Sequence, residues 1–167
     1  AAGDFDNDGG CDLYFCAIDG TNVLYLNVGG MQFEDVTATA GIGCPRLHST
    51  SAVFADVDGD DRVDLLVSTL GQGVHCFMNE GKGRFRESTA EAGLVSQSGS
   101  MSLALADVDG DGKEDIIAGN LGMNSPLHIS EKGPAELYYS DFDGNGSVDP
   151  FLNFYVQGKS YPFVSRD

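Results

Sequence analysis

The sequence predicts an all-β protein made of repeats, a β-propeller whose blades are four-stranded antiparallel sheets. Three observations support this prediction. An acidic loop occurs four times, the first three loops begin 52 and 51 residues apart, and short apolar runs separated by glycine turns fill each interval. Four short strands in about 50 residues is the period of a propeller blade. The predicted repeats are approximately residues 1–46, 47–98, 99–134 and 135–167.

The strands are clearest in the second repeat. An apolar run at 52–55 leads into the acidic loop, and a second run at 63–68 leaves it. A third run at 74–78 follows a Gly-Gln-Gly turn, and a fourth surrounds Phe85 after another glycine-rich turn. Short apolar runs joined by glycine turns are typical of hairpins. Sustained 3.6-residue periodicity is missing, so 37–40 and 89–92 can each form at most one helical turn.

The segments between the loops repeat as well. Residues 27–42 match residues 79–94 at an offset of 52, with Asn, Phe, Thr and Gly at equivalent positions. Residues 51–56 match residues 102–107 at an offset of 51. Two separate blocks that share one period indicate internal duplication.

The third and last repeats depart from this scheme. Only 34 residues separate the loop at Asp107 from the loop at Asp141, so we expect a shortened or rearranged blade with an irregular connection at 119–126. The stretch 151–164 is expected to form a hairpin that ends without completing a repeat. Because a propeller needs about 4–8 blades to close, the sequence predicts a piece of a larger protein.

Each acidic loop places side-chain oxygens at its first, third, fifth and ninth residues, and alternate spacing with glycines lets these oxygens converge. The backbone carbonyl of the seventh residue is a further expected ligand. The predicted metal ligands are Asp4, Asp6, Asp8, Gly10 and Asp12 in the first loop; Asp56, Asp58, Asp60, Arg62 and Asp64 in the second; Asp107, Asp109, Asp111, Lys113 and Asp115 in the third; and Asp141, Asp143, Asn145, Ser147 and Asp149 in the fourth.

Electrostatics requires a cation in such a loop when it is ordered. Two carboxylates about 4 Å apart repel by about 4 kcal/mol at an effective dielectric constant of about 20. Ligands that are all oxygen select hard cations and disfavour zinc and copper. Calcium accepts about 6–8 oxygens in a flexible cage, whereas magnesium demands octahedral geometry and keeps its waters. The sequence therefore predicts up to four calcium ions, one for each loop.

The EF-hand is the obvious alternative for a loop that begins Asp-x-Asp-x-Asp-Gly. Its twelfth residue is a bidentate Glu and both of its flanks are helical. The twelfth residues here are Phe15, Val67, Ala118 and Leu152, and the flanks are predicted strands. A paired loop of the dockerin type also needs helical flanks, and the flanks here are predicted strands. The loops are therefore expected to be structural calcium sites between strands.

The net charge of −17 excludes some functions and leaves others open. No basic stripe is present that could neutralise phosphates, so nucleic acid is not an expected partner. The sequence has no run of about 18 apolar residues, which is the length that would predict a membrane-spanning helix. Four cysteines allow three disulfide pairings in an oxidising compartment or four free thiols, and their spacing decides neither. The cysteines are Cys11, Cys16, Cys44 and Cys76.

No catalytic constellation stands out. His48, His75 and His128 occur in unrelated contexts and are interpreted as surface or packed histidines. Tyr155 and Tyr161 could line a ligand surface, whereas a glutamate such as Glu136 is expected to matter little for stability.

The acidic loops and the blocks at 24–30 and 33–41 carry a resemblance to a known family. They resemble the FG-GAP-type calcium-binding repeats of integrin α-subunit propellers. They are especially similar to the VCBS branch, including repeat proteins of the cartilage acidic protein and ASPIC/UnbV type. The resemblance implies a calcium-stabilised, roughly seven-bladed propeller that is extracellular, at the cell surface or periplasmic. Asp61 stands where the family usually has glycine.

The functional expectation is a non-enzymatic repeat protein that recognises a protein or a glycan outside the cell, with calcium in a structural role. One alternative is the scaffold or accessory module of a polysaccharide-active enzyme. Such an enzyme needs a cluster of charged side chains in the central channel, for which the sequence offers only scattered candidates. The other alternative is a spacer or assembly module.

Overall fold

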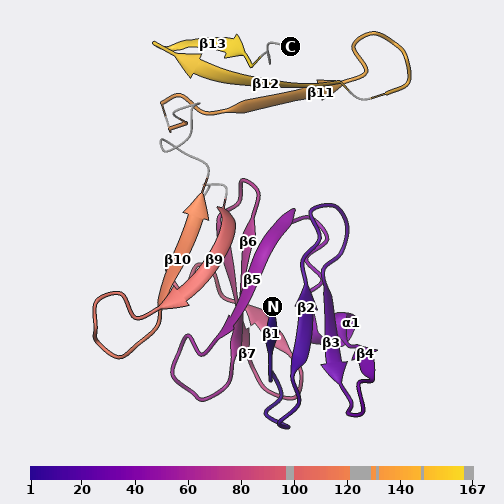
Figure 1. The fold of residues 1–167 in the computed structure, drawn as a ribbon, viewed down its shortest axis with the longest axis vertical. Coiled ribbons are helices and arrows are strands. Elements are labelled where there is room, and N and C mark those ends of the chain that lie inside the picture. The colour runs from indigo at the N-terminus through magenta and orange to yellow at the C-terminus, as the bar shows by residue number, and fades with distance from the viewer. Residues whose placement is uncertain (97–99, 121–128, 131, 148, 164–167) are drawn as a thin grey trace. The chain divides into compact units, whose positions relative to one another are not determined.

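The computed structural model describes residues 1–96, 100–120, 129–130, 132–147 and 149–163 (Figure 1). The chain divides into two compact units, Ala1–Asn120 and Leu121–Asp167. Among the described residues, no helix has the length and apolar character needed to cross a membrane.

The first sheet of the first unit contains four antiparallel strands that follow one another in chain order. The second strand follows the first acidic loop, and the third and fourth strands lie on either side of the glycine-rich turn. The predicted helical turn forms after the last strand. The elements are β1 (Ala2–Gly3), β2 (Asp12–Phe15), β3 (Val23–Asn27), β4 (Phe33–Asp35) and α1 (Thr37–Ala40).

The second sheet repeats this arrangement and confirms the four strands predicted for the second repeat. Its strands also lie in chain order and are antiparallel. Every residue of its second strand is buried, because neighbouring side chains of a strand point to opposite faces and both faces of this strand are covered. The strands are β5 (Ser49–Ala55), β6 (Asp64–Thr69), β7 (Val74–Asn79) and β8 (Phe85–Glu87).

The third sheet has two strands in the part of the repeat that the structure describes, β9 (Ser100–Ala106) and β10 (Asp115–Asn120). The expectation of a shortened or rearranged blade stays a prediction, because residues 121–128 of this repeat lie outside the described residues. The expectation of an irregular connection from residue 119 is wrong for Gly119 and Asn120, which pair with β9 as the end of β10. The rest of that predicted connection, residues 121–126, lies outside the described residues.

The described residues of the second unit form an antiparallel sheet of three strands in chain order. Its last two strands form the hairpin predicted for the end of the chain, although Val164 lies outside the described residues. The strands are β11 (Glu136–Ser140), β12 (Asp149–Val156) and β13 (Lys159–Pro162).

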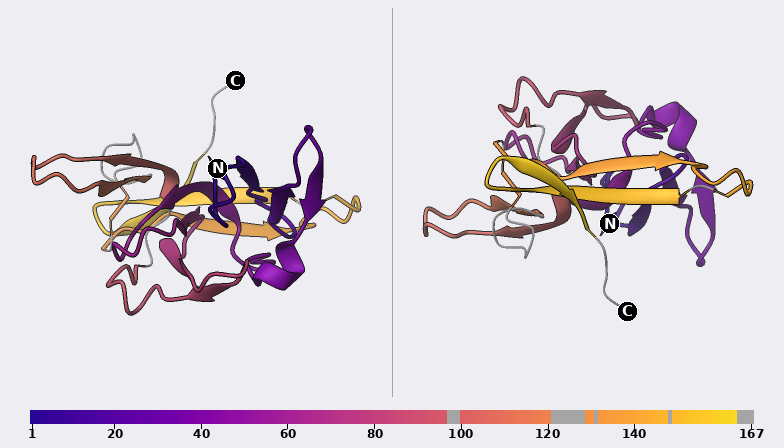
Figure 2. Two further views of the ribbon diagram at one scale, coloured as in Figure 1. Left: turned by 90° about the horizontal axis from the view of Figure 1, so that it is seen from below. Right: turned by 90° about the horizontal axis from the view of Figure 1, so that it is seen from above.

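Two apolar clusters hold the sheets of the first unit together. The first lies between the first two sheets and includes Tyr14, Leu65 and Phe85. The second lies between the second and third sheets and includes Leu66 and Leu105. In both end-on views of Figure 2, α1 and the acidic loop after β9 lie on opposite sides of this unit. The described structure is thus all-β, with two four-stranded antiparallel sheets packed against each other in the first unit, and closure into a propeller remains a prediction.

The first two sheets approach each other closely where β1 passes β5. A Cβ atom added to Gly3 would lie 2.8 Å from Cδ2 of Phe54. Only glycine therefore fits at this crossing without a shift of the neighbouring ring.

Candidate metal sites

The four acidic loops share one backbone feature. The fourth and sixth residues of each loop have positive φ, which curls the chain around the carboxylates. Glycine adopts this conformation at little cost, and Asn and Asp tolerate it better than other residues. The φ angles are 61° at Asn7 and 88° at Gly9, 80° at Gly59 and 66° at Asp61, 81° at Gly110 and 86° at Gly112, and 75° at Gly144 and 86° at Gly146.

Backbone N–H groups bind the carboxylate of the first residue in each loop. In the second loop, Asp56 accepts hydrogen bonds from the N–H groups of Gly59 at 2.8 Å and Asp61 at 3.0 Å. Asp4, Asp107 and Asp141 accept the equivalent bond from the sixth residue, each at 2.9 Å. These bonds hold the first carboxylate inside the curl of its loop.

The carboxylate of the ninth residue closes each loop. One of its oxygens accepts a hydrogen bond from the N–H of the second residue: Phe5 at 3.0 Å, Val57 at 2.9 Å, Val108 at 2.9 Å and Phe142 at 3.0 Å. In the first two loops this residue, Asp12 or Asp64, is almost completely buried. Burial raises the pKa of Asp64, and hydrogen bonds from the N–H groups of Asn79 and Val57 oppose that rise.

Three carboxylates converge in every loop. In each group, one potential ligand atom from each residue lies within 4.8 Å of the others, and all three donors are oxygens. This donor set and spacing fit a hard cation such as calcium. The groups are Asp4, Asp6 and Asp8; Asp56, Asp58 and Asp64; Asp107, Asp109 and Asp115; and Asp141, Asp143 and Asp149.

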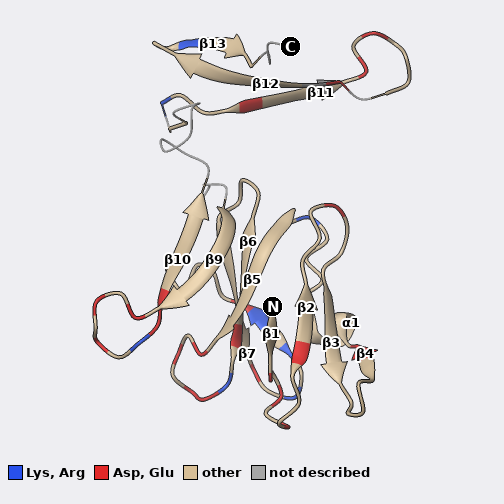
Figure 3. Cartoon of the chain, viewed as in Figure 1, with Lys and Arg blue, Asp and Glu red and all other residues tan. Residues whose placement is uncertain are grey.

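The three acidic loops of the first unit lie at the same end of its sheets (Figure 3). This follows from the repeat, because each loop joins the first strand of its sheet to the second.

Some predicted ligands lie outside these convergent groups. Asp12 is bound by the backbone N–H groups of Phe5 and Asn27, the latter at 2.8 Å. Asp60 forms an ion pair with Arg62 and also accepts the Arg62 N–H at 2.9 Å. Asp111 accepts the N–H of Lys113 at 2.8 Å. Their roles as ligands remain predictions.

The seventh residues occupy equivalent positions in all four loops. The N–H group of each donates to the side chain of the fifth residue, at 2.6 Å for Gly10 and 2.8 Å for Ser147. In the fourth loop the fifth residue is Asn145, whose Nδ2 also donates to Asp143 at 2.9 Å. Coordination by the carbonyls of Gly10, Arg62, Lys113 and Ser147 also remains a prediction.

Two asparagines support the loops, and sequence reasoning assigned them no role. The N–H group of Asn79 donates to Asp64 at 2.7 Å, and the N–H of Asn27 donates to Asp12. Their side-chain amides donate to the carbonyl of the eighth loop residue, Val63 at 3.0 Å and Cys11 at 3.1 Å. The signal was present in the sequence, because both residues open the block that repeats at an offset of 52.

A second repeated interaction occurs in both four-stranded sheets. It links a carboxylate, a threonine hydroxyl group and a backbone N–H group of the third strand. Asp35 and Glu87 each accept a 2.6 Å hydrogen bond from a hydroxyl group, from Thr37 and Thr89 respectively. The same hydroxyl oxygens accept the N–H groups of Leu24 at 2.9 Å and Cys76 at 3.0 Å. These bonds lower the pKa of Asp35 and Glu87, because they favour the ionised carboxylate.

The remaining candidates have structural partners. His48 Nδ1 lies 2.7 Å from the carbonyl oxygen of Ile18, and His75 Nδ1 lies 3.4 Å from Glu87. His128 lies outside the described residues. All four cysteines are free thiols, which answers the question that their spacing left open.

The expectation that Glu136 is unimportant conflicts with its contacts. Its carboxylate accepts hydrogen bonds from the hydroxyl groups of Tyr155 at 3.0 Å, Tyr138 at 3.2 Å and Ser160 at 3.4 Å. Glu136 therefore ties together all three strands of the second unit.

Comparison with known proteins agrees with this geometry. A family model described as FG-GAP-like repeat matches residues 4–67 and 56–118. Cartilage acidic protein 1 is 25% identical in Mus musculus and 26% identical in Homo sapiens, each over 85% of this chain. The Xenopus tropicalis protein is 24% identical over 92% of this chain. The matches span only 26–28% of the length of these relatives. The chain belongs to the FG-GAP-like repeat family.

Proposed function

We propose that this chain is a non-enzymatic, calcium-stabilised repeat module that recognises a protein or a glycan outside the cell. The observation that carries the proposal is the convergence of three carboxylates within 4.8 Å in each of four loops that have positive φ at the same two positions. A bound cation would offset the repulsion among these carboxylates. It would fix the turn between the first two strands of each sheet.

Calcium binding is tested by thermal unfolding and by titration calorimetry of the chain. Millimolar calcium should raise the melting temperature of EDTA-treated protein, and equal concentrations of magnesium should raise it less, since the loops are flexible oxygen cages. Asp58→Ala removes one carboxylate of the second group and should lower the number of calcium ions bound. Glu34→Ala is the matched control, because Glu34 is an exposed carboxylate outside the loops.

The acidic surface supports a recognition role of a particular kind. A chain with a net charge of −17 attracts cationic ligands and repels anionic ones, and it does not oppose the approach of neutral ones. We therefore propose neutral glycans or basic protein surfaces as ligands. A binding screen with immobilised glycans and extracellular proteins, performed in calcium and repeated in EDTA, tests this role. Binding to neither class would favour the alternative of a spacer module.

A role as the accessory module of a polysaccharide-active enzyme is the second candidate. Its support is the open cavity of about 590 Å³ in the first unit, lined by residues that include Gln72, His75 and Glu87. Retention of the chain on an insoluble neutral polysaccharide, lost in Gln72→Ala, would favour this role over protein recognition.

A further inference from the structure

The first two acidic loops are joined by a direct hydrogen bond. Asn7, the fourth residue of the first loop, donates from Nδ2 to the carbonyl oxygen of Asp61 at 3.2 Å. Asp61 is the sixth residue of the second loop, and its N–H group donates to Asp56 at 3.0 Å. Asp61 is therefore bound both by the first carboxylate of its own loop and by the preceding loop.

This hydrogen bond joins the two positions at which the loops depart from glycine. The fourth and sixth residues of all four loops have positive φ, and six of these eight residues are glycines. The other two are Asn7 and Asp61, with φ angles of 61° and 66°. Glycine at the fourth position, such as Gly59, has no side chain that could form an equivalent bond.

A second connection between the same two loops is buried. The Phe5 N–H group donates to Asp12 at 3.0 Å, and the Phe5 carbonyl accepts the 2.7 Å hydrogen bond from Asn79 Nδ2. The Asn79 N–H group donates to Asp64 at 2.7 Å. Asp12 and Asp64 are the ninth residues of the two loops and are almost completely buried. The closing carboxylates of both loops are thus linked through Phe5 and Asn79.

Asn79 is fixed on the second loop by two further contacts. Its side-chain amide donates to the Val63 carbonyl at 3.0 Å, and its own carbonyl accepts a 2.9 Å hydrogen bond from Arg62 Nε. Arg62 and Val63 are the seventh and eighth residues of the second loop. A rearrangement of either loop would therefore separate Asn79 from Phe5.

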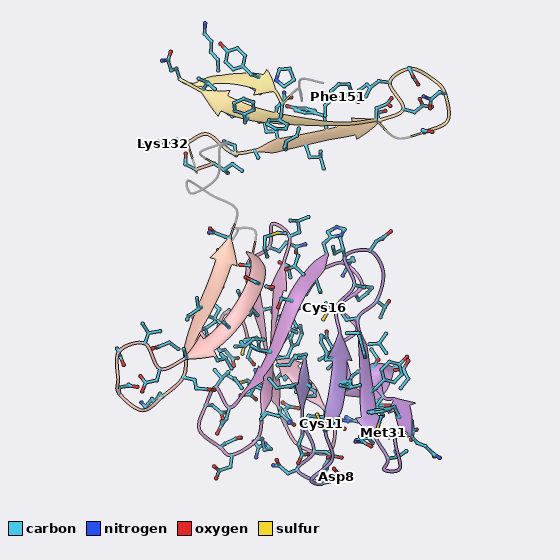
Figure 4. All side chains as sticks on the ribbon, viewed as in Figure 1. Asp8, Cys11, Cys16, Met31, Lys132 and Phe151 are labelled. Atoms are coloured by element: carbon cyan, nitrogen blue, oxygen red, sulfur yellow. The ribbon has the colours of Figure 1, made fainter. Side chains whose placement is uncertain are left out.

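Both connections lie within the first unit, between its two four-stranded sheets. Asp8 and Cys11 of the first loop lie at the end of this unit where the second loop is also found (Figure 4). Every residue of the two connections belongs to the described part of the chain, and none belongs to the second unit. The contact between the loops is therefore internal to one compact unit.

The second and third loops are not joined in this way among the described residues. An apolar cluster holds their sheets together, but the described hydrogen bonds of residues 107–115 stay within the third loop. The residue equivalent to Asn7 is Gly59, which has no amide to donate. This pair of loops therefore provides an internal comparison for the first pair.

The proposed role of calcium gives each loop two states, a curled state that holds the ion and a looser state. Without a cation, repulsion among the three carboxylates opposes the curl, and a bound ion removes this opposition. The two connections need both loops in the curled state, since Asn7 and Phe5 belong to one loop and Asp61 to the other. An ion in one loop therefore holds in place the groups that the other loop must meet.

We propose that the first and second loops bind calcium cooperatively, with Asn7 and Asn79 as the positioning residues that couple them. An ion in either loop raises the calcium affinity of the other by about tenfold, within the range usual for coupled sites. The third loop binds its ion independently of the second. This inference rests on the calcium role proposed above, whereas that role does not rest on it, because four independent sites would also stabilise the chain.

Titration calorimetry of the whole chain with calcium measures this coupling through a thermodynamic cycle. Asp109→Ala and Asp143→Ala together silence the third and fourth loops and leave the first pair. Adding Asp6→Ala leaves only the second loop, and adding Asp58→Ala instead leaves only the first. The coupling factor is the product of the two association constants of the pair divided by the product of the two single-loop constants. A factor of about ten is expected.

The same cycle on the second and third loops is the matched control. Asp6→Ala and Asp143→Ala leave this pair, and Asp58→Ala or Asp109→Ala then isolates one of its loops. Because no amide connects these two loops, their coupling factor should be about 1.

Asn7→Gly tests the surface connection without removing a carboxylate. Glycine is the residue at this position in the other three loops, so the backbone conformation is retained. The first pair should still bind two ions, while its coupling factor falls by about threefold, the contribution of one ordinary hydrogen bond. Gln157→Gly makes the same change at an exposed residue with a φ of 50° in the second unit, and should leave the factor unchanged.

Asn79→Ala removes the buried connection and should also lower the coupling factor. Circular dichroism checks that it is folded, and Asn7→Gly decides the question if it is not. A coupling factor of about 1 for the first pair would overturn the proposal while leaving the calcium sites in place. So would a factor that is unchanged in Asn7→Gly, or an equal factor for the second and third loops. A chain that binds no calcium would contradict the proposed calcium role as well.

Discussion

The side-chain amide of Asn79 donates a 2.7 Å hydrogen bond to the carbonyl oxygen of Phe5, 74 residues earlier in the chain. This bond joins the turn of one sheet to the acidic loop of the preceding sheet. The same asparagine also donates through its backbone N–H to Asp64, the last carboxylate of its own loop. One residue therefore couples an acidic loop within its sheet to the contact between two sheets.

Asn79→Ala should reduce stability more than Asn27→Ala does. Both changes remove a bond within one sheet, but only Asn79→Ala also leaves the buried Phe5 carbonyl without its partner. Loss of a partner for a buried polar group costs about 1–3 kcal/mol. Urea unfolding of the two variants measures the difference, and equal losses would show that the bond between the sheets contributes nothing.

Glu87→Gln should destabilise the protein at neutral pH and have no effect in acid. The pKa of Glu87 is lowered in the folded state, first by the hydrogen bond from Thr89. A lowered pKa means that the ionised group stabilises the fold above its unfolded pKa, and that this contribution disappears as the pH falls through the folded value. Because Glu87 is largely exposed, the effect should be a few tenths of a kcal/mol.

Melting temperatures of Glu87→Gln and the unmodified protein, measured from pH 3 to pH 7, test this prediction. The two curves should converge at the acid end. A constant difference across that range would mean that the charge of Glu87 plays no part.

The four thiols should differ in reactivity. Cys76 is fully buried, and burial raises its pKa to about 11. Burial also raises the pKa of Cys16 and Cys44, whereas Cys11 is exposed. Since the thiolate is the reactive form, iodoacetamide at pH 8 should label Cys11 first and Cys76 only on unfolding. Mass spectrometry of timed digests measures the order, and early labelling of Cys76 would contradict the packing of β7.

Asp61→Gly should stabilise the second loop by about 0.5 kcal/mol, because Asp61 has a φ of 66° where each of the other three loops has glycine. Asp61→Ala keeps the backbone cost while removing the same carboxylate, and so serves as the control. Denaturant unfolding of both variants in calcium measures their free energies of unfolding. Equal stability of Asp61→Ala and Asp61→Gly would contradict the prediction.

The features that depend on residue spacing along the chain could be predicted from the sequence. The loops, the strands of the second repeat and the helical turn at α1 follow from local pattern and from the period of about 50 residues. The partners of Asn79 and Thr89 could not be predicted in this way, because their contacts join residues that only the fold brings together. The contacts of Glu136 could not be predicted for the same reason, since its three hydroxyl partners come from different strands.

Thermal unfolding after calcium removal tests the central claim of this account most directly. The chain is stripped with EDTA, dialysed, and melted with and without millimolar calcium at constant ionic strength. A rise in melting temperature with calcium, reversed by EDTA and reduced in Asp58→Ala but not in Glu34→Ala, is the predicted result. An identical melting temperature in calcium and in EDTA would contradict a structural role for calcium in these loops.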